Sequence, residues 1–172
     1  QFLEAKWLLS DPVRVESTHR KAANYYNEKS NSGQAIYHAI KSSDNAFIAG
    51  MLANTGADLV KSGQFEWLLD TIKELPRDVR DVYYQLHYYE GEAHRYRAFY
   101  EKARQAYSAC IQLAKNNEDA YYQSRANAGI AHIYLDTIQP GMAEPYLLEA
   151  ISFAQKSVKS NFHDMEMLKR QF

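Results

Sequence analysis

Apolar residues recur three and four positions apart along most of this chain, which is the period of an amphipathic α-helix. No run of β-branched residues alternating with polar ones, the pattern of a half-buried strand, interrupts them. The seven glycines and four prolines lie mostly at the junctions between these helical patterns. The pattern therefore predicts an all-α protein of nine or ten helices without a sheet.

The junctions divide the first half of the chain into four predicted helices. The first begins at Asp11-Pro12, a capping residue followed by a proline in the first turn, and it is broken at residues 30–33. A short helix over 34–41 follows, Ser43-Asp44 caps a third helix, and a fourth runs to Leu75-Pro76. The apolar faces of these helices consist of Val15, Ala22, Ala23, Tyr26, Ala35, Ile36, Ala39, Ile40, Phe47, Ile48, Met51, Leu52, Leu59, Val60, Phe65, Leu68, Leu69 and Ile72.

A tripeptide occurs twice in this region. Ser32-Gly33-Gln34 and Ser62-Gly63-Gln64 are 30 residues apart, and each copy is expected to end one helix and open the next. A repeated helix-turn-helix unit explains the recurrence.

The second half matches the spacing of a tetratricopeptide repeat, which places a small residue at position 8, alanine at 20, an aromatic near 24 and a small residue at 27. Small residues are needed where two helix backbones cross closely. Two tandem copies predict a right-handed α-solenoid of antiparallel helix pairs. Pro145 falls inside the second helix of the second copy, which either starts later than expected or is kinked there. The first copy comprises Gly91, Ala103, Tyr107 and Cys110, and the second, after a two-residue insertion between its helices, Gly129, Ala143, Leu147 and Ala150.

The start of the chain also resembles a known family. The run Thr18-His19-Arg20-Lys21-Ala22-Ala23-Asn24-Tyr25-Tyr26 precedes Gly33-Gln34-Ala35-Ile36-Tyr37-His38-Ala39-Ile40 and then Ser43-Asp44. This order resembles the start of the helical-repeat region in large bacterial ATP-dependent transcription activators of the MalT type, the LuxR-type STAND regulators. Further similar positions, in a resemblance that covers roughly Phe2 to Gln155, are Gly63-Gln64-Phe65, Trp67-Leu68 and Leu75-Pro76.

In that family an NTPase domain and a winged helix precede the repeats, and a helix-turn-helix follows them. The resemblance implies that this chain is a fragment without the ATPase and DNA-binding parts. Residues 1–10 would be the end of a preceding winged-helix-like domain or a linker helix, and residues 11–76 would form irregular helical repeats. Residues 77–157 would form two tetratricopeptide-like repeats, and residues 158–172 would open a further helix.

The composition argues against several classes of function. The 172 residues can form one domain with a substantial core, and 20 basic against 21 acidic residues argue against direct nucleic-acid binding. One cysteine, Cys110, cannot form an intrachain disulfide or a multi-thiolate zinc site, which fits a reducing cytoplasm. No apolar run approaches the ~20 residues that span a bilayer, and no signal-peptide pattern opens the chain. We therefore expect a cytoplasmic protein that does not contact a membrane.

Residues with catalytic or metal-binding chemistry occur without a matching motif. The chain lacks a glycine-rich phosphate loop and a Gly-x-Ser-x-Gly elbow. His94 and His132 occupy equivalent repeat positions, where packing between helices is favoured over a metal site because no carboxylate recurs with them. His19 and His38 belong to the family-like stretches and suit packing or capping. We expect no catalytic or metal residues and no cofactor in this segment, with ATP bound only by an NTPase domain elsewhere in the parent protein.

A candidate ligand surface follows from the repeat register. With Gly91 at position 8, the inward positions of the two first helices carry aromatic, amide and charged side chains, which suit a sugar or a peptide. The alternative is a solvated groove edge with no ligand. The row consists of Gln85, Tyr88, Glu92, Arg95, Gln123 and Asn127.

The resemblance implies a regulatory sensor and linker segment. It would bind a small-molecule inducer such as a sugar, contact other domains of the same parent chain, or do both. The alternative is a plain tetratricopeptide-like scaffold that binds a protein or peptide partner.

Overall fold

The computed structural model describes residues 12–157. Helix accounts for 84% of these residues and none of them lies in a strand, which confirms the all-α prediction. The predicted segments at 1–10 and 158–172, and the proposed cap Asp11, lie outside the described residues. The helices are α2 (Pro12–Glu28), α3 (Ser32–Lys41), α4 (Asn45–Lys61), α5 (Phe65–Glu74), α6 (Arg77–Val82), α7 (Gln85–Tyr96), α8 (Tyr100–Asn116), α9 (Ala120–Asp136) and α10 (Pro140–Lys156).

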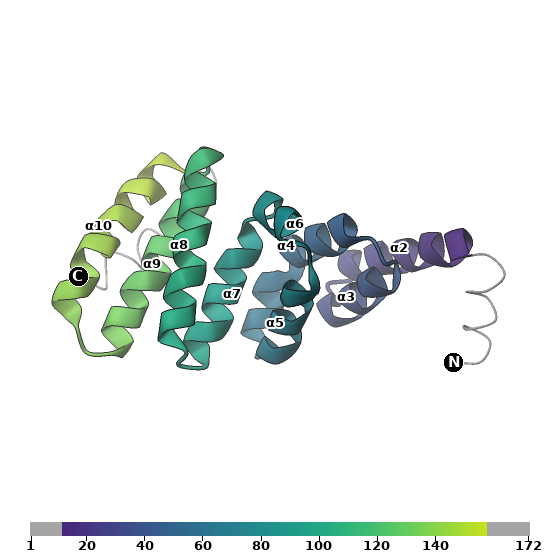
Figure 1. Cartoon of the computed structure of the whole chain (residues 1–172), viewed down its shortest axis with the longest axis horizontal. Coiled ribbons are helices and arrows are strands. Elements are labelled where there is room, and N and C mark those ends of the chain that lie inside the picture. Colours follow the sequence, from purple (N-terminus) through teal and green to yellow (C-terminus); the bar gives the residue numbers. More distant parts are fainter. Residues whose placement is uncertain (1–11, 158–172) are drawn as a thin grey trace.

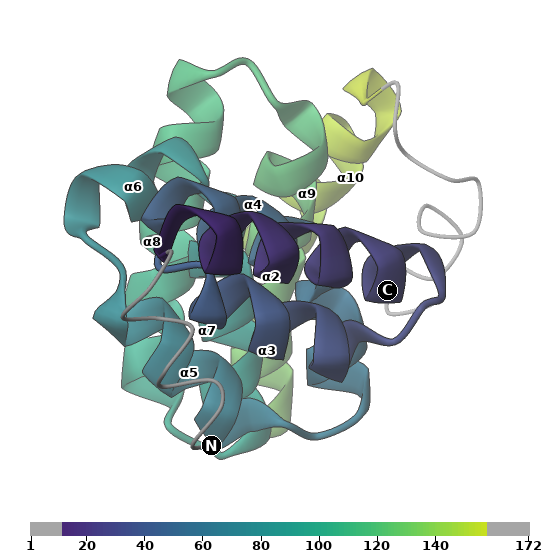
Figure 2. The same ribbon diagram turned by 90° about the vertical axis from the view of Figure 1, so that its right-hand side faces the viewer.

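The helices form a solenoid, because each pair packs on the next in chain order (Figure 1). Four hairpin pairs follow one another: α2–α3, α4–α5, α7–α8 and α9–α10, with the short α6 between the second and the third. The first helices α4, α7 and α9 contact one another in succession. Viewed from the N-terminal end, α2 and α3 stand in front and the later pairs lie behind them (Figure 2).

The four hairpin turns share one geometry. Each turn has three residues, the middle one adopts a left-handed conformation, and the next backbone N–H bonds to a carbonyl five residues earlier. The residues with positive φ are Ser30, Gly63, Ala98 and Ile138, at 54°, 73°, 58° and 56°.

The two Ser-Gly-Gln tripeptides are not equivalent in this arrangement. Ser62-Gly63-Gln64 forms the turn between α4 and α5, whereas Ser32-Gly33-Gln34 forms the first turn of α3. The side chain of Asn31 caps α3 by accepting the backbone N–H of Gln34 at 3.2 Å. The prediction that the first copy ends a helix is therefore wrong, and α3 begins at Ser32.

A longer internal repeat relates α3–α4–α5 to α8–α9–α10 at a constant offset of 75 residues. The N-cap residues Asp44 and Asp119 correspond, and each accepts backbone N–H groups of the helix that it starts. The residues before them, Ser43 and Glu118, both have positive φ. The last residues of α3 and α8, Lys41 and Asn116, correspond, and α4 and α9 correspond over their whole length. The first residues of α5 and α10, Phe65 and Pro140, correspond as well.

The predicted apolar faces are buried or half-buried. A main core runs from α2 to α9, and a smaller cluster lies between α9 and α10. Members of the predicted faces that are only half-buried are Ala22, Tyr26, Ile40, Phe47, Val60, Phe65 and Leu69.

The small residues of the repeat register lie at close crossings. The ring of Tyr107 on α8 packs against Gly91 of α7 and Gly129 of α9, where a β-carbon would collide with it. Ala103 and Ala143 are fully buried. The two-residue insertion lengthens α9 and leaves the turn unchanged, since both hairpin turns have three residues.

Two local features differ from a simple repeat. Pro145 lies inside α10, which starts at Pro140, so the alternative of a later helix start is excluded. Its missing N–H leaves the carbonyl of Gly141 without the usual helical donor. The six-residue helix α6 follows Leu75-Pro76 and was not predicted.

Candidate functional site

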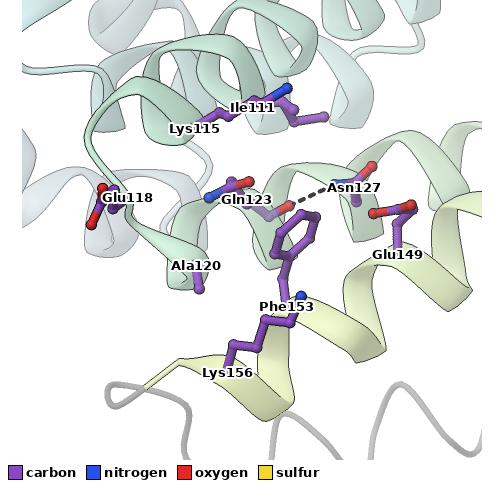
Figure 3. A pocket seen from close by; sticks show the side chains of 9 residues that line it. All are labelled: Ile111, Lys115, Glu118, Ala120, Gln123, Asn127, Glu149, Phe153 and Lys156. Atoms are coloured by element: carbon purple, nitrogen blue, oxygen red, sulfur yellow. Dashed lines mark hydrogen bonds between the residues drawn. The ribbon is translucent and has the colours of Figure 1, made fainter.

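A pocket of about 690 Å³ opens between α8 and α10, with α9 as its floor (Figure 3). It lies beside the start of α9, and that start is fixed by Asp119. The carboxylate of Asp119 accepts the backbone N–H groups of Tyr121 and Tyr122 and, at 2.8 Å, the hydroxyl of Tyr84. The buried Ser124 hydroxyl donates to the carbonyl of Ala150 at 2.8 Å, which ties α9 to α10. The pocket therefore has a rigid floor.

Two buried primary amides form that floor. Gln123 is 7% exposed and Asn127 6%, and they lie one helical turn apart on α9 (Figure 3). The Nδ2 of Asn127 donates to the backbone carbonyl of Gln123 at 2.9 Å. A primary amide carries two donor hydrogens and one acceptor oxygen, so this floor can both donate to and accept from a ligand.

The walls combine apolar surface with both signs of charge. Ile111 and Lys115 come from α8, and Glu149, Phe153 and Lys156 come from α10. The Phe153 ring stands beside the two amides (Figure 3). Glu118 and Ala120 complete the lining at the α8–α9 turn.

A smaller pocket of about 260 Å³ occupies the equivalent place 75 residues earlier. Ile48 corresponds to Gln123, and Leu52 corresponds to Asn127. Both of these residues are buried hydrophobic side chains. The same fold position therefore accepts aliphatic residues in one copy and carries amides in the other.

The structure divides the predicted ligand row between two environments. Gln123 and Asn127 line the α9 pocket, whereas the four members on α7, Gln85, Tyr88, Glu92 and Arg95, do not. Tyr88, Glu92 and Arg95 make polar contacts between α7, α8 and α9. Gln85 Oε1 is buried without a hydrogen-bond partner among the described residues. Whether any of the six contacts a ligand stays a prediction.

The polar contacts of the α7 members link three helices. The Tyr107 hydroxyl of α8 donates to Glu92 at 2.5 Å, and Arg95 pairs with Asp136 of α9 at 3.1 Å. Arg125 of α9 donates to the Tyr88 hydroxyl at 2.9 Å. Burial and the neighbouring Glu92 carboxylate raise the pKa of Tyr88 and of Tyr107 above the ordinary value. Burial lowers the pKa of Arg95, but Glu92 and Asp136 outweigh it and hold the guanidinium charged.

The repeat register did not identify the pocket walls. The register predicts a row along the first helix of each pair, whereas most of the lining comes from the second helices, α8 and α10. These residues are Ile111, Lys115, Glu149, Phe153 and Lys156. Their helical spacing on α10, with Glu149, Phe153 and Lys156 on one face, was the available signal.

Histidine and cysteine side chains pack within the fold. The rings of His94 and Phe99 lie edge to face at 6.2 Å, and burial lowers the pKa of His94. His19 and His38 share a hydrogen bond of 2.9 Å between their Nδ1 atoms. Burial raises the pKa of the Cys110 thiol to about 12, as expected for an inert thiol. Among residues 12–157, no three metal-ligating side chains cluster.

Comparison with known proteins finds two similar regulators. The chain is 28% identical over 150 residues to the HTH-type transcriptional regulator MalT of Vibrio campbellii. It is 25% identical over 153 residues to the protein of the same name from Vibrio parahaemolyticus. These alignments cover 81% and 83% of the chain but 16% of each relative, so the chain spans about one sixth of their length. No family model and no solved structure matches it. No helix within residues 12–157 is long and apolar enough to cross a membrane.

Proposed function

We propose that this chain is a regulatory segment of a MalT-like transcription activator, where it binds an inducer, contacts neighbouring domains, or does both. Similarity over about four fifths of the chain to two regulators named MalT supports this proposal. The solenoid supports it too, because stacked helix pairs present long surfaces for binding. The second half acts as two tetratricopeptide-like repeats, and the segment works in the cytoplasm.

The observation that carries the binding role is the polar floor of the α9 pocket. At the equivalent positions α4 carries the buried aliphatic residues Ile48, which lines the smaller pocket, and Leu52. Packing alone does not require amides at Gln123 and Asn127, and we infer that they serve contacts from outside the fold. Their amides, beside the Phe153 ring, suit a polar inducer such as a sugar, since a ring stacks while amides orient.

The segment performs no chemistry in this proposal. It neither hydrolyses ATP nor contacts DNA directly, and it requires no cofactor or metal. ATP hydrolysis and DNA binding would belong to other domains of the parent protein. Saturable nucleotide hydrolysis by the purified chain would contradict this assignment.

A plain scaffold for a protein partner is the second candidate, and exposed apolar side chains favour it. Tyr96 and Phe99 at the α7–α8 turn, and Ile138 and Met142 at the α9–α10 turn, are 45–89% exposed. Apolar side chains gathered at one edge of a solenoid are typical of protein contacts.

A reporter assay in the regulator that carries these repeats tests the proposal. We expect Gln123→Ile and Asn127→Leu to weaken the response to inducer while the protein accumulates normally. Gln112→Ala, an exposed substitution on α8, is the matched control and should leave the response unchanged. An unchanged response in both pocket variants would contradict the binding role.

A further inference from the structure

The amides of Gln123 and Asn127 form a row along the floor of the α9 pocket. Four residues along a helix rise about 6 Å, so these amides repeat at that interval. In an extended polypeptide the N–H and the carbonyl of one residue point toward the same edge, and this recurs at every second residue, about 6.6 Å apart. Each such residue offers one N–H and one carbonyl, and a primary amide can pair with both. The row therefore matches the edge of an extended main chain.

The two walls match the side chains of such a segment. Successive side chains of an extended chain point to opposite sides. Over α9, one side would meet Ile111 and Lys115 of α8, and the other would meet Phe153 and Glu149 of α10. Each wall offers an apolar and a charged contact, so both sets of side chains would find partners.

Charge is distributed unevenly along the groove. Lys115 and Lys156 lie in the last turns of α8 and α10, at the end of the groove where α9 begins. Two positive charges and one negative charge, that of Glu118, therefore line this end. Glu149 lies two turns earlier on α10, beside Asn127 (Figure 3). Two helical turns span about 10 Å, which equals about three extended residues. An acidic and a basic side chain about three residues apart would complement this groove.

We propose that the α9 pocket binds a short extended polypeptide segment through its main chain, with an acidic side chain toward Lys115 and Lys156 and a basic one toward Glu149. This inference rests on the proposed function, since it names the kind of component that the regulatory segment receives. It names a segment of another domain or protein as the occupant of this pocket, and the experiment below distinguishes that occupant from a sugar.

Selection from a phage-displayed library of random heptapeptides on the purified chain tests the inference. We expect selected peptides to carry an acidic and a basic residue about three positions apart. By calorimetry, Gln123→Ile and Asn127→Leu should each weaken binding of a selected peptide about tenfold or more, since each removes main-chain hydrogen bonds. N-methylation of alternate peptide nitrogens should weaken it similarly. Gln112→Ala should leave the affinity unchanged, and none of the three variants should unfold at a lower temperature.

Three results would overturn the inference. The first is that no peptide is selected, and the second is that both pocket substitutions leave the affinity of a selected peptide unchanged. The third is that the chain binds a neutral oligosaccharide but no peptide, and that both substitutions abolish the oligosaccharide binding. The last result would leave the regulatory proposal standing with a sugar at this site. The reporter assay described above would fail independently if the pocket had no regulatory role.

Discussion

The ring of Tyr107 lies so close to Gly91 that a β-carbon there would come within 2.6 Å of two ring atoms. Gly129 approaches the same ring from α9, and the Tyr107 side chain is fully buried. Because α7, α8 and α9 enclose it, the ring has no room to shift. This contact fixes the spacing of three successive helices.

Alanine at either glycine should therefore destabilise the fold. We expect Gly91→Ala and Gly129→Ala each to lower the free energy of unfolding by about 1–3 kcal/mol, measured by urea denaturation. Gly141→Ala is the control, since nothing lies within 4 Å of a β-carbon there. Equal stability of all three variants would mean that the helices are not held at this contact.

Larger side chains at the buried alanines test the repeat register. Ala103 and Ala143 are 0% exposed, so Ala103→Leu and Ala143→Leu should overpack the helix crossings. The expected loss is about 1–3 kcal/mol in the free energy of unfolding for each variant. Unchanged melting temperatures in both variants would contradict the register.

The turn at Ile138 contains a β-branched residue in a left-handed conformation. Its φ is 56° and its side chain is 89% exposed, so neither the backbone nor burial favours isoleucine there. The equivalent position of the α4–α5 turn carries Gly63. We expect Ile138→Gly to stabilise the protein by about 0.5–1 kcal/mol and Gly63→Ala to destabilise it, by thermal or chemical unfolding. Destabilisation by Ile138→Gly would show that the side chain makes a stabilising contact.

Alkaline pH should unfold the protein through its buried tyrosines. Burial raises the pKa of Tyr88, Tyr107 and Tyr122 above the ordinary tyrosine value of about 10. The unfolded chain would release these protons near pH 10, while the folded chain retains them. The stabilisation is therefore complete below pH 10 and is lost as pH rises above it. Tyr107→Phe should reduce this dependence, and a free energy of unfolding that stays flat from pH 9 to pH 11 would contradict it.

Helix boundaries were the most predictable part of the structure, because local chemistry sets them. Asp44 caps α4 as predicted, since its side chain needs only the backbone N–H of Phe47 three residues ahead. The sequence predicts that α3 begins at residue 34, because Gly33 is read as a helix break. In the structure α3 begins at Ser32, because the side chain of Asn31 caps it. The six residues of α6 carry no full apolar period and could not be recognised as a helix.

The candidate site was harder to predict, since it depends on contacts between helices. The repeat register predicts that Glu92 and Arg95 face an open groove. In the fold, Tyr107 of α8 bonds to Glu92 and Asp136 of α9 pairs with Arg95. The spacing of residues along one helix does not predict contacts that other helices make with it. The amide floor of the pocket arises because α9 carries Gln123 and Asn127, while α4 carries Ile48 and Leu52 at the equivalent positions. That difference is recognised only after the 75-residue offset is known.

The stability of the double variant Gln123→Ile, Asn127→Leu tests most directly whether the amides of the α9 pocket serve binding. If they do, urea denaturation should show the double variant to be as stable as the wild-type chain, or more stable, because α4 carries the buried aliphatic residues Ile48 and Leu52 at the equivalent positions. A loss of more than about 2 kcal/mol, the cost of breaking a buried polar contact that the fold requires, would contradict the account. The amides would then be structural.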